Sequence, residues 1–431
     1  VTACGGSTGK TNSANDSSAN SQQGAGQTSA DEQIKLTFYS YNLASTSQLE
    51  GTKKLIREFE EANPNIKIEP VAVSSTDINA KVQADIAAGS PTDIAQIIFD
   101  GLDFAVNNFN AKPLEDIVSA EQMAGDFVGF SPNGLQLGQL NGKTYGLPFT
   151  FSTPVLFYNA KLFEQAGLDP KNPPKTWAET KEYAIKITKN TSNAGLHIGG
   201  TSGLDWIIQG LIGSNGGQVL SEDRKTIMFG EDEAVGAIEM WQDLMQSGAH
   251  SKMNDTEATE AFTQGKLGMF LYTSALQSSF LKASEAAGWE LMAAKMPSFE
   301  NRTTTPVNSG SALLILSDDE AKQKAAYEFL KFVTSERGYT IITSELGYLP
   351  LRPSIVEDPQ YLKSWVEENP LVKPNLEQLN SLKQWVSYPG QNWKQIEQTL
   401  LDAVSKSIHG KTGEVSKTMK DAQERAQALV Q

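Results

Sequence analysis

The sequence has few of the residues from which metal centres and nucleophilic active sites are built. Its 431 residues include one cysteine and three histidines. His197, His250 and His409 are widely spaced and lack metal-ligand companions, whereas a zinc site or a Ser-His-Asp site needs several such groups together. The single cysteine also excludes an internal disulfide. We therefore expect no metal and no cofactor. A secreted glycoside hydrolase needs only two carboxylates, so the 51 acidic residues leave that alternative open.

Positive charge and long apolar runs are also scarce. Lysine and arginine number 36 against 51 aspartate and glutamate residues, which gives a formal net charge of -15. A protein of this charge repels nucleic acid and anionic lipid surfaces at long range, although a local pocket can still bind a small anion. No apolar run approaches the ~20 residues of a membrane-spanning helix. We therefore expect no nucleic-acid partner, and membrane attachment only through a lipid.

The cysteine stands in a context typical of a bacterial lipoprotein processing site. Ala3 and Gly5 flank Cys4, and residues 5–31 consist of small and polar side chains with Lys10, Asp16 and Asp31 as the only charges. Such a segment cannot bury enough apolar surface to offset its ordering entropy. We predict lipid attachment at Cys4 and a disordered tether over residues 1–31. The alternative is an ordinary surface cysteine near a frayed terminus.

The first half of the folded part alternates between strand and helix patterns. A β-rich segment at 34–39 precedes a helical stripe with Leu55, Ile56 and Phe59, and Ser47 to Glu50 has the spacing of a capping box. Strand patterns at 66–73 and 94–99 enclose a second helix with Ile78 and Val82. This alternation predicts a parallel sheet, whose ligands bind at the carboxyl ends of the strands. Here those ends are the loops 39–45, 74–77 and 99–103.

The second half repeats this logic. We expect helices at 176–189, around Trp241, and at about 320–333, together with a strand at 265–272. The chain is long enough for two domains of roughly 200 residues each. Two α/β lobes are the economical interpretation.

A series of short motifs occurs along most of residues 34–431. In sequence order they are Gly146-Leu147-Pro148-Phe149, Ser152-Thr153-Pro154-Val155-Leu156-Phe157-Tyr158-Asn159, Phe163-Glu164-Gln165-Ala166-Gly167-Leu168, Pro173-Pro174-Lys175-Thr176-Trp177, residues 262–268, Asn308-Ser309-Gly310-Ser311 and Glu345-Leu346-Gly347-Tyr348-Leu349-Pro350. Together they resemble the extracellular solute-binding proteins of ABC importers. Within that family, the segment that carries these motifs is most similar to the glycerol-3-phosphate-binding and multiple-sugar-binding subgroup.

The resemblance implies a two-lobed periplasmic-binding-protein-like (type II) α/β fold, with a hinge and a ligand cleft between the lobes. Lobe 1 is expected to comprise residues 32–151 and 310–350, and lobe 2 residues 152–309 and 351–431. The crossovers are expected near 152–154, 308–310 and 350–353, where short segments containing Pro, Gly or Ser separate regular elements.

Candidate solute contacts come from the resemblance and from physical reasoning. Aromatic rings offer apolar faces to a sugar ring, and carboxylate, amide and hydroxyl groups satisfy its hydroxyls. The residues that the resemblance points to are Tyr41, Asp77, Ser152, Trp206, Ser274, Gly310 and Tyr348, together with Tyr388 in the turn Val386-Ser387-Tyr388-Pro389-Gly390, called the late turn below. Asp100 is added because it follows a strand at its carboxyl end. For Trp206 the alternative is a core position, whereas Trp241 is assigned to the core.

The late turn departs from the phosphate-binding members. Those relatives carry an arginine there, and a guanidinium matches a phosphate well. Here the nearest equivalent is Tyr388, and no arginine lies between Arg352 and Arg425. Arg302 and Arg352 are possible substitutes, but the sequence does not place them in the cleft. A neutral, hydroxyl-rich solute is therefore favoured over a glycerol phosphate.

These observations predict a substrate-binding lipoprotein of an ABC importer, which captures a sugar or oligosaccharide and delivers it to the membrane permease. Binding of glycerol-3-phosphate or a glycerophosphodiester is the alternative. No enzymatic step is expected. We expect a monomer at the extracellular face of a bacterial, Gram-positive, cell membrane, with the small solute and the permease subunits as its partners.

Overall fold

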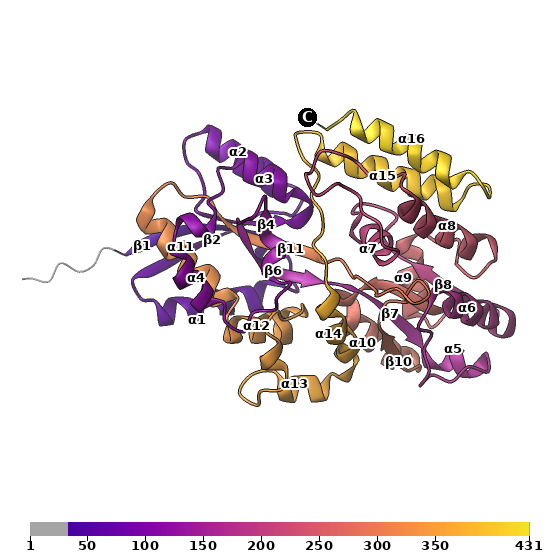
Figure 1. The fold of residues 1–431 in the computed structure, drawn as a ribbon. Helices are drawn as coiled ribbons and strands as arrows, with labels where there is room; N and C mark the ends of the chain where they lie inside the picture. The colour runs from indigo at the N-terminus through magenta and orange to yellow at the C-terminus, as the bar shows by residue number, and fades with distance from the viewer. Residues whose placement is uncertain (1–32, 431) are drawn as a thin grey trace, which may run out of the picture.

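The strands form two main sheets, which lie side by side in Figure 1. Residues 33–430 are described by a computed structural model. The first sheet has the order β2-β1-β3-β11-β6 and the second β10-β7-β9-β8, with β4-β5 as a separate hairpin. The strand bounds are β1 (Ile34–Ser40), β2 (Ile66–Ala72), β3 (Ile94–Ile98), β4 (Gln139–Leu140), β5 (Lys143–Thr144), β6 (Gly146–Ser152), β7 (Pro154–Asn159), β8 (Ala194–Ile198), β9 (Leu267–Thr273), β10 (Leu291–Ala294) and β11 (Ser309–Ile315).

The first sheet, the centre of lobe 1, contains the predicted parallel strands. β1 pairs in parallel with β2 and β3, while β11 is antiparallel to β3 and β6. Its helices are α1 (Leu49–Ala62), α2 (Ile78–Ala87), α3 (Leu102–Asn108), α4 (Ala120–Asp126), α11 (Glu320–Val333) and α12 (Glu336–Ile341). In α1 the side chains of Leu55, Ile56 and Phe59 are buried, as their spacing predicted. The capping box predicted for α1 is absent, because Gln48 occupies the N-cap and makes no side-chain cap bond.

The second sheet is the centre of lobe 2. β8 and β9 are parallel, and β7 is antiparallel to β9 and β10. The helices are α5 (Ala160–Gln165), α6 (Trp177–Thr191), α7 (Trp206–Ser214), α8 (Asp232–Gln246), α9 (Asp255–Thr263), α10 (Gln277–Ala287), α15 (Trp393–Ile408) and α16 (Val415–Gln427). The carboxyl-terminal helices α15 and α16 pack on α8 of this lobe (Figure 1). Trp241 on α8 is fully buried, which confirms its assignment to the core.

One short chain segment connects the two sheets directly. β6 ends at Ser152 and β7 begins at Pro154, so a single residue, Thr153, joins the two sheets. Every residue of both strands is buried. The helix α13 (Lys363–Glu368) precedes α14 (Lys373–Gln378) in the chain, and α14 lies at this junction. On α14, Gln378 donates to the carbonyl of Pro154 at 2.5 Å.

The segments that pass between the lobes lie next to one another. The amide of Leu349 donates to the carbonyl of Phe151, Ser309 pairs with Ser152 across β11 and β6, and Val307 forms a bridge with Lys383. These contacts bring together segments that are up to 198 residues apart in the sequence, a separation that periodicity alone does not reveal. Between residues 33 and 430, no helix has the length and apolar character needed to cross a membrane.

Candidate functional site

The carboxyl ends of several strands from both lobes meet at the junction. Tyr41 follows β1, and its phenol lies against Gln96, Thr150 and Ser311, with Tyr348 nearby. Burial, and next the proximity of Tyr348, raise the pKa of Tyr41 well above its usual value. Tyr348 is itself partly buried, and burial raises its pKa too. Both phenols therefore stay neutral and can donate hydrogen bonds.

Hydroxyl groups line the place where β6 and β11 of the first sheet meet β7 and β9 of the second, called the crossing strands below. Ser152 Oγ lies 2.8 Å from the Thr273 hydroxyl and 2.5 Å from the Ser309 hydroxyl. Ser274 follows β9, and its Oγ accepts from the amide of Thr153 at 3.3 Å. This cluster is neutral, and it consists of groups that both donate and accept hydrogen bonds.

Gly310 is required by the backbone at the same place. Its φ is 101°, in the region that favours glycine, and a Cβ there would lie 1.9 Å from the carbonyl oxygen of Thr150. Any side chain would therefore push β11 away from β6.

A buried charged network lies at the interface between the lobes. Asp100 of lobe 1 is 4% exposed and forms an ion pair with Lys394 at the start of α15. Lys394 also donates to Glu397 at 2.8 Å, and Glu397 accepts from the amide of Asp205. Asp205 just precedes α7 and is fully buried. The network therefore links one strand end of lobe 1 to two helices of lobe 2.

Asp205 also organises the late turn. Its carboxylate accepts from Trp385 Nε1 at 2.8 Å, from the Tyr388 hydroxyl at 2.7 Å and from Gln209 Nε2 at 3.0 Å. Tyr388 is 1% exposed and packs edge-to-face on Phe229. In this arrangement the Tyr388 hydroxyl is already committed to a buried carboxylate.

This network contains three carboxyl groups, and its one lysine contacts two of them, Asp100 and Glu397. Burial raises the pKa of Asp100 and of Asp205, and burial together with these two neighbouring carboxylates raises the pKa of Glu397 to about 9. Burial alone would lower the pKa of Lys394, but the attraction of Asp100 and Glu397 outweighs that effect and raises it. Three charged carboxylates would leave excess negative charge out of water, so Glu397 stays protonated at neutral pH.

A second ion pair joins the lobes a short distance away. Arg224 of lobe 2 donates to Asp103 of α3 at 2.7 Å and to the carbonyl of Ser387 at 2.6 Å. The backbone of Arg224 has a positive φ of 63° in a turn where Ser221 and Thr226 are paired. Sequence reasoning missed this residue, because the signal lies in a tight turn and in contacts that are 121 and 163 positions away.

The nine predicted contact residues are not all in the same place. Tyr41, Ser152, Ser274, Gly310 and Tyr348 lie around the crossing strands, whereas Asp100 and Tyr388 belong to the charged network. Asp77 is exposed in the loop after β2 and accepts from Ser74 Oγ at 2.6 Å. Trp206 begins α7 and is 6% exposed, within the hydrophobic core. Their roles in binding a solute stay predictions.

Neither of the two arginines suggested as phosphate ligands joins the network. Arg352 is buried and donates to the carbonyls of Thr334, Val128 and Asp126. Arg302 is exposed in a loop. Lys394, which the sequence did not single out, is the cation at the interface between Asp100 and Glu397.

Two of the histidines are brought together by the fold. His197 Nδ1 lies 2.8 Å from Ser251 Oγ and its Nε2 lies 2.9 Å from Asp255, while His250 contacts the amide of Ile198. Asp255 also accepts from the amide of Gly200 in the loop after β8. His197 and Ser251 are buried, so this Ser-His-Asp arrangement connects α9 to the end of β8 and offers no accessible nucleophile.

Known proteins share both the sequence pattern and the fold. Residues 54–374 match the profile of a family described as bacterial extracellular solute-binding protein. The sn-glycerol-3-phosphate-binding periplasmic protein UgpB of Pectobacterium atrosepticum is 28% identical over 332 residues, or 73% of each chain.

Solved structures agree along nearly the whole chain. The cyclic alpha-maltosyl-1,6-maltose binding protein from Arthrobacter globiformis has a TM-score of 0.81 at 20% identity, covering 92% of this chain and 99% of that one. UgpB from Mycobacterium tuberculosis in complex with glycerophosphocholine has a TM-score of 0.76 at 20% identity, covering 92% and 98%. The predicted α/β fold of periplasmic solute-binding proteins is therefore confirmed.

Proposed function

Because this chain belongs to the family of bacterial extracellular solute-binding proteins, we propose that its solute is a neutral carbohydrate held between the two lobes. The family assigns it the role of a transport receptor of an ABC importer, without enzymatic activity. The proposal concerns the chemistry of the solute. It further holds that the loaded protein delivers the sugar or oligosaccharide to the permease subunits.

One observation carries the choice of a neutral solute: the cations of the two buried ion-pair groups that join the lobes are already paired with carboxylates. Lys394 lies between Asp100 and Glu397, and Arg224 is bound to Asp103 and a carbonyl. An anionic solute would have to break one of these pairs and leave a buried carboxylate without its partner, which is costly. The net charge of -15 adds no long-range attraction for an anion.

The groups that remain at the crossing strands suit a sugar. Tyr41 and Tyr348 offer rings and neutral phenols, and Ser152, Thr273 and Ser309 offer hydroxyls. Rings can pack on the C–H face of a sugar while hydroxyl groups pair with its polar edge. A solute that touches both lobes favours their closed arrangement, because it binds that arrangement more tightly.

Glycerol-3-phosphate or a glycerophosphodiester is the second candidate, and the relative from P. atrosepticum supports it by name. Tyr388, in place of the arginine expected from phosphate-binding relatives, argues against it. The Tyr388 side chain cannot supply the two parallel donors of a guanidinium.

Calorimetric titration of the purified chain decides between these solutes. A thermal-shift screen of sugars and oligosaccharides first identifies the best carbohydrate, since a ligand at 100 times its dissociation constant stabilises the native state by ~2.7 kcal/mol. We expect binding heat with that carbohydrate and none with glycerol-3-phosphate or glycerophosphocholine. Tight binding of either phosphate compound by the unmodified chain would overturn the proposal.

A variant tests whether the carbohydrate binds at the crossing strands. Tyr348→Ala should weaken carbohydrate binding by about 1–3 kcal/mol, as loss of an aromatic contact does at recognition sites. Tyr361→Ala, at another partly buried tyrosine, serves as the control and should bind normally. Equal affinity of the two variants would place the solute elsewhere.

The cell-surface attachment is proposed on the sequence context of Cys4 alone. The cysteine and the tether 1–31 lie outside the described residues. We infer a lipid on Cys4 and a monomer at the outer face of a Gram-positive cell membrane. The family supports the extracellular or periplasmic location.

A further inference from the structure

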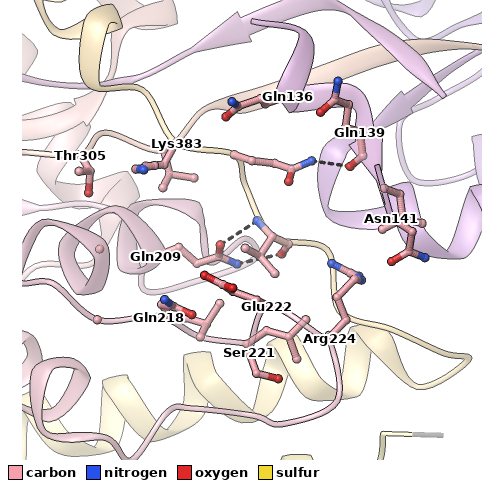
Figure 2. A pocket seen from close by; sticks show the side chains of 18 of the residues that line it. Gln136, Gln139, Asn141, Gln209, Gln218, Ser221, Glu222, Arg224, Thr305 and Lys383 are labelled. Atoms are coloured by element: carbon pink, nitrogen blue, oxygen red, sulfur yellow. Dashed lines mark hydrogen bonds between the residues drawn. The ribbon is translucent and has the colours of Figure 1, made fainter. Parts of the chain in front are cut away.

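A cavity of about 670 Å³ lies between the lobes, beside the segment 383–386 (Figure 2). One wall comes from the β4-β5 hairpin of lobe 1, with Gln139 and Asn141. The opposite wall comes from α7 and the loop after it in lobe 2, with Gln218 and Glu222. None of the nine residues predicted to contact the solute lines this cavity. Its volume lies within the usual range for small-molecule sites, about 300–1,000 Å³.

The segment 383–388 borders both this cavity and the buried charged network. Trp385 and Tyr388 direct their polar atoms to Asp205, whereas Gln384 and Val386 line the cavity. Gln209, which also lines the cavity, donates to Asp205 through its Nε2. None of the nine predicted contact residues lines the cavity, so a molecule in it would be separate from a solute at the crossing strands.

Amide side chains from both lobes dominate the polar lining. Gln209 and Gln384 are occupied, the first with both backbone groups of Val386 and the second with the carbonyls of Leu137 and Gln139. By contrast, the side chains of Gln136, Asn141 and Gln218 form no hydrogen bond with any residue between 33 and 430, and the hydroxyl of Thr305 is buried there without a partner. These four groups supply both donors and acceptors.

The remainder of the lining is apolar and carries little net charge. Val219, Leu220 and Val386 form apolar surface, and Lys383 and Glu222 bring opposite charges. Arg224 also borders the cavity, but its guanidinium is bound to Asp103 and Ser387. Unpaired amides above apolar surface, with one lysine and one glutamate of opposite charge at its border, match a molecule that has both hydroxyl groups and a C–H face.

We propose that this cavity is a second solute site, which binds a neutral hydroxyl-rich molecule such as a short oligosaccharide. The lining contains no aromatic ring, so stacking is absent and binding is weaker than at a site with tyrosines. The bound molecule contacts both lobes at once. Its binding therefore favours the interlobe arrangement in which Arg224 meets Asp103.

Methyl NMR with maltotetraose as the probe tests this proposal. During a titration, we expect the methyl resonances of Val219, Leu220 and Val386 to shift at millimolar rather than micromolar concentrations of maltotetraose. Weak binding has a dissociation constant in the millimolar range. The double variant Gln136→Leu, Gln218→Leu replaces two exposed amide side chains with apolar side chains of similar size, and it should abolish these shifts. The control Gln360→Leu alters another exposed glutamine and should keep them.

A second variant distinguishes binding in the cavity from binding of the solute at the crossing strands. Tyr348→Ala should leave the shifts at Val219, Leu220 and Val386 unchanged even if it abolishes tight binding. Failure of the chain to bind any carbohydrate tightly would therefore contradict only the proposed function. The second site is refuted if these methyl resonances do not move with the wild-type chain, or move equally in the double glutamine variant.

Discussion

At the scale of single residues, the most informative group is the carboxyl of Glu397. Its pKa is raised to about 9, chiefly by burial and next by Asp205 and Asp100, against an ordinary value of 4.5. Unfolding exposes this group to water, where it releases its proton at any pH between these two values. The native state therefore binds more protons than the unfolded state, and the free energy of unfolding falls as the pH rises from about 4.5 to about 9.

Glu397→Gln should reduce this pH dependence. Glutamine resembles the protonated carboxyl, can accept from the amide of Asp205, and never ionises. We expect the variant to gain stability relative to the wild type between pH 5 and pH 8, as measured by urea unfolding at both values. Glu121→Gln, at an exposed carboxyl on α4, should show no such gain. A constant stability difference at the two pH values would show that Glu397 is ionised in the native state.

At the scale of elements, the turn at 221–226 and helix α3 hold the two lobes together. Arg224 lies on that turn and contacts both Asp103 of α3 and the segment at Ser387. Because Asp103 is buried, loss of the guanidinium would leave its carboxylate without a cationic partner. The same turn borders the cavity of Figure 2, so one short element contributes to the lobe contact and to the proposed second site.

Arg224→Gln should loosen this contact. Removing one partner of a buried charge pair costs about 2 kcal/mol or more, and that loss weighs against the interlobe arrangement in which the pair forms. We expect a larger radius of gyration in small-angle scattering of the unliganded variant, and weaker solute binding because closure becomes less favourable. Arg57→Gln, at an exposed arginine on α1, is the control. An unchanged radius of gyration would mean that other contacts alone hold the lobes together.

At the scale of the whole molecule, the question is how the receptor stays near its permease. The described helices include none that could span a membrane, and the sequence context of Cys4 is the basis for a lipid anchor. Cys4→Ser, expressed with a complete lipoprotein signal, should release the protein into the medium, because the lipid-bearing thiol is lost. Fractionation of cells and medium followed by immunoblotting measures this. A Gly5→Ala variant should stay with the membrane, and equal retention of both variants would contradict the anchor.

Local patterns in the sequence determined much of the architecture. Hydrophobic spacing predicted α1, α2 and the parallel strands β1, β2 and β3, because helices and strands repeat their buried positions every few residues. The ordered motifs from Gly146 to Pro350 indicated the family. The predicted capping box at Ser47 was wrong because Gln48 takes the N-cap.

Only the tertiary structure decided which charges meet. Asp100, Asp205 and Glu397 span nearly 300 residues of the sequence. In the fold, Lys394 contacts Asp100 and Glu397, and the amide of Asp205 donates to Glu397. Arg224 meets Asp103 and Ser387, and His197 meets Ser251 and Asp255, through contacts of the same long-range kind. The physical reason is that secondary structure depends on neighbours along the chain, whereas burial, pairing and pKa depend on which segments pack together in space. The sequence therefore determined the class of receptor, and the packing of the two lobes decided the electrostatics of its interface.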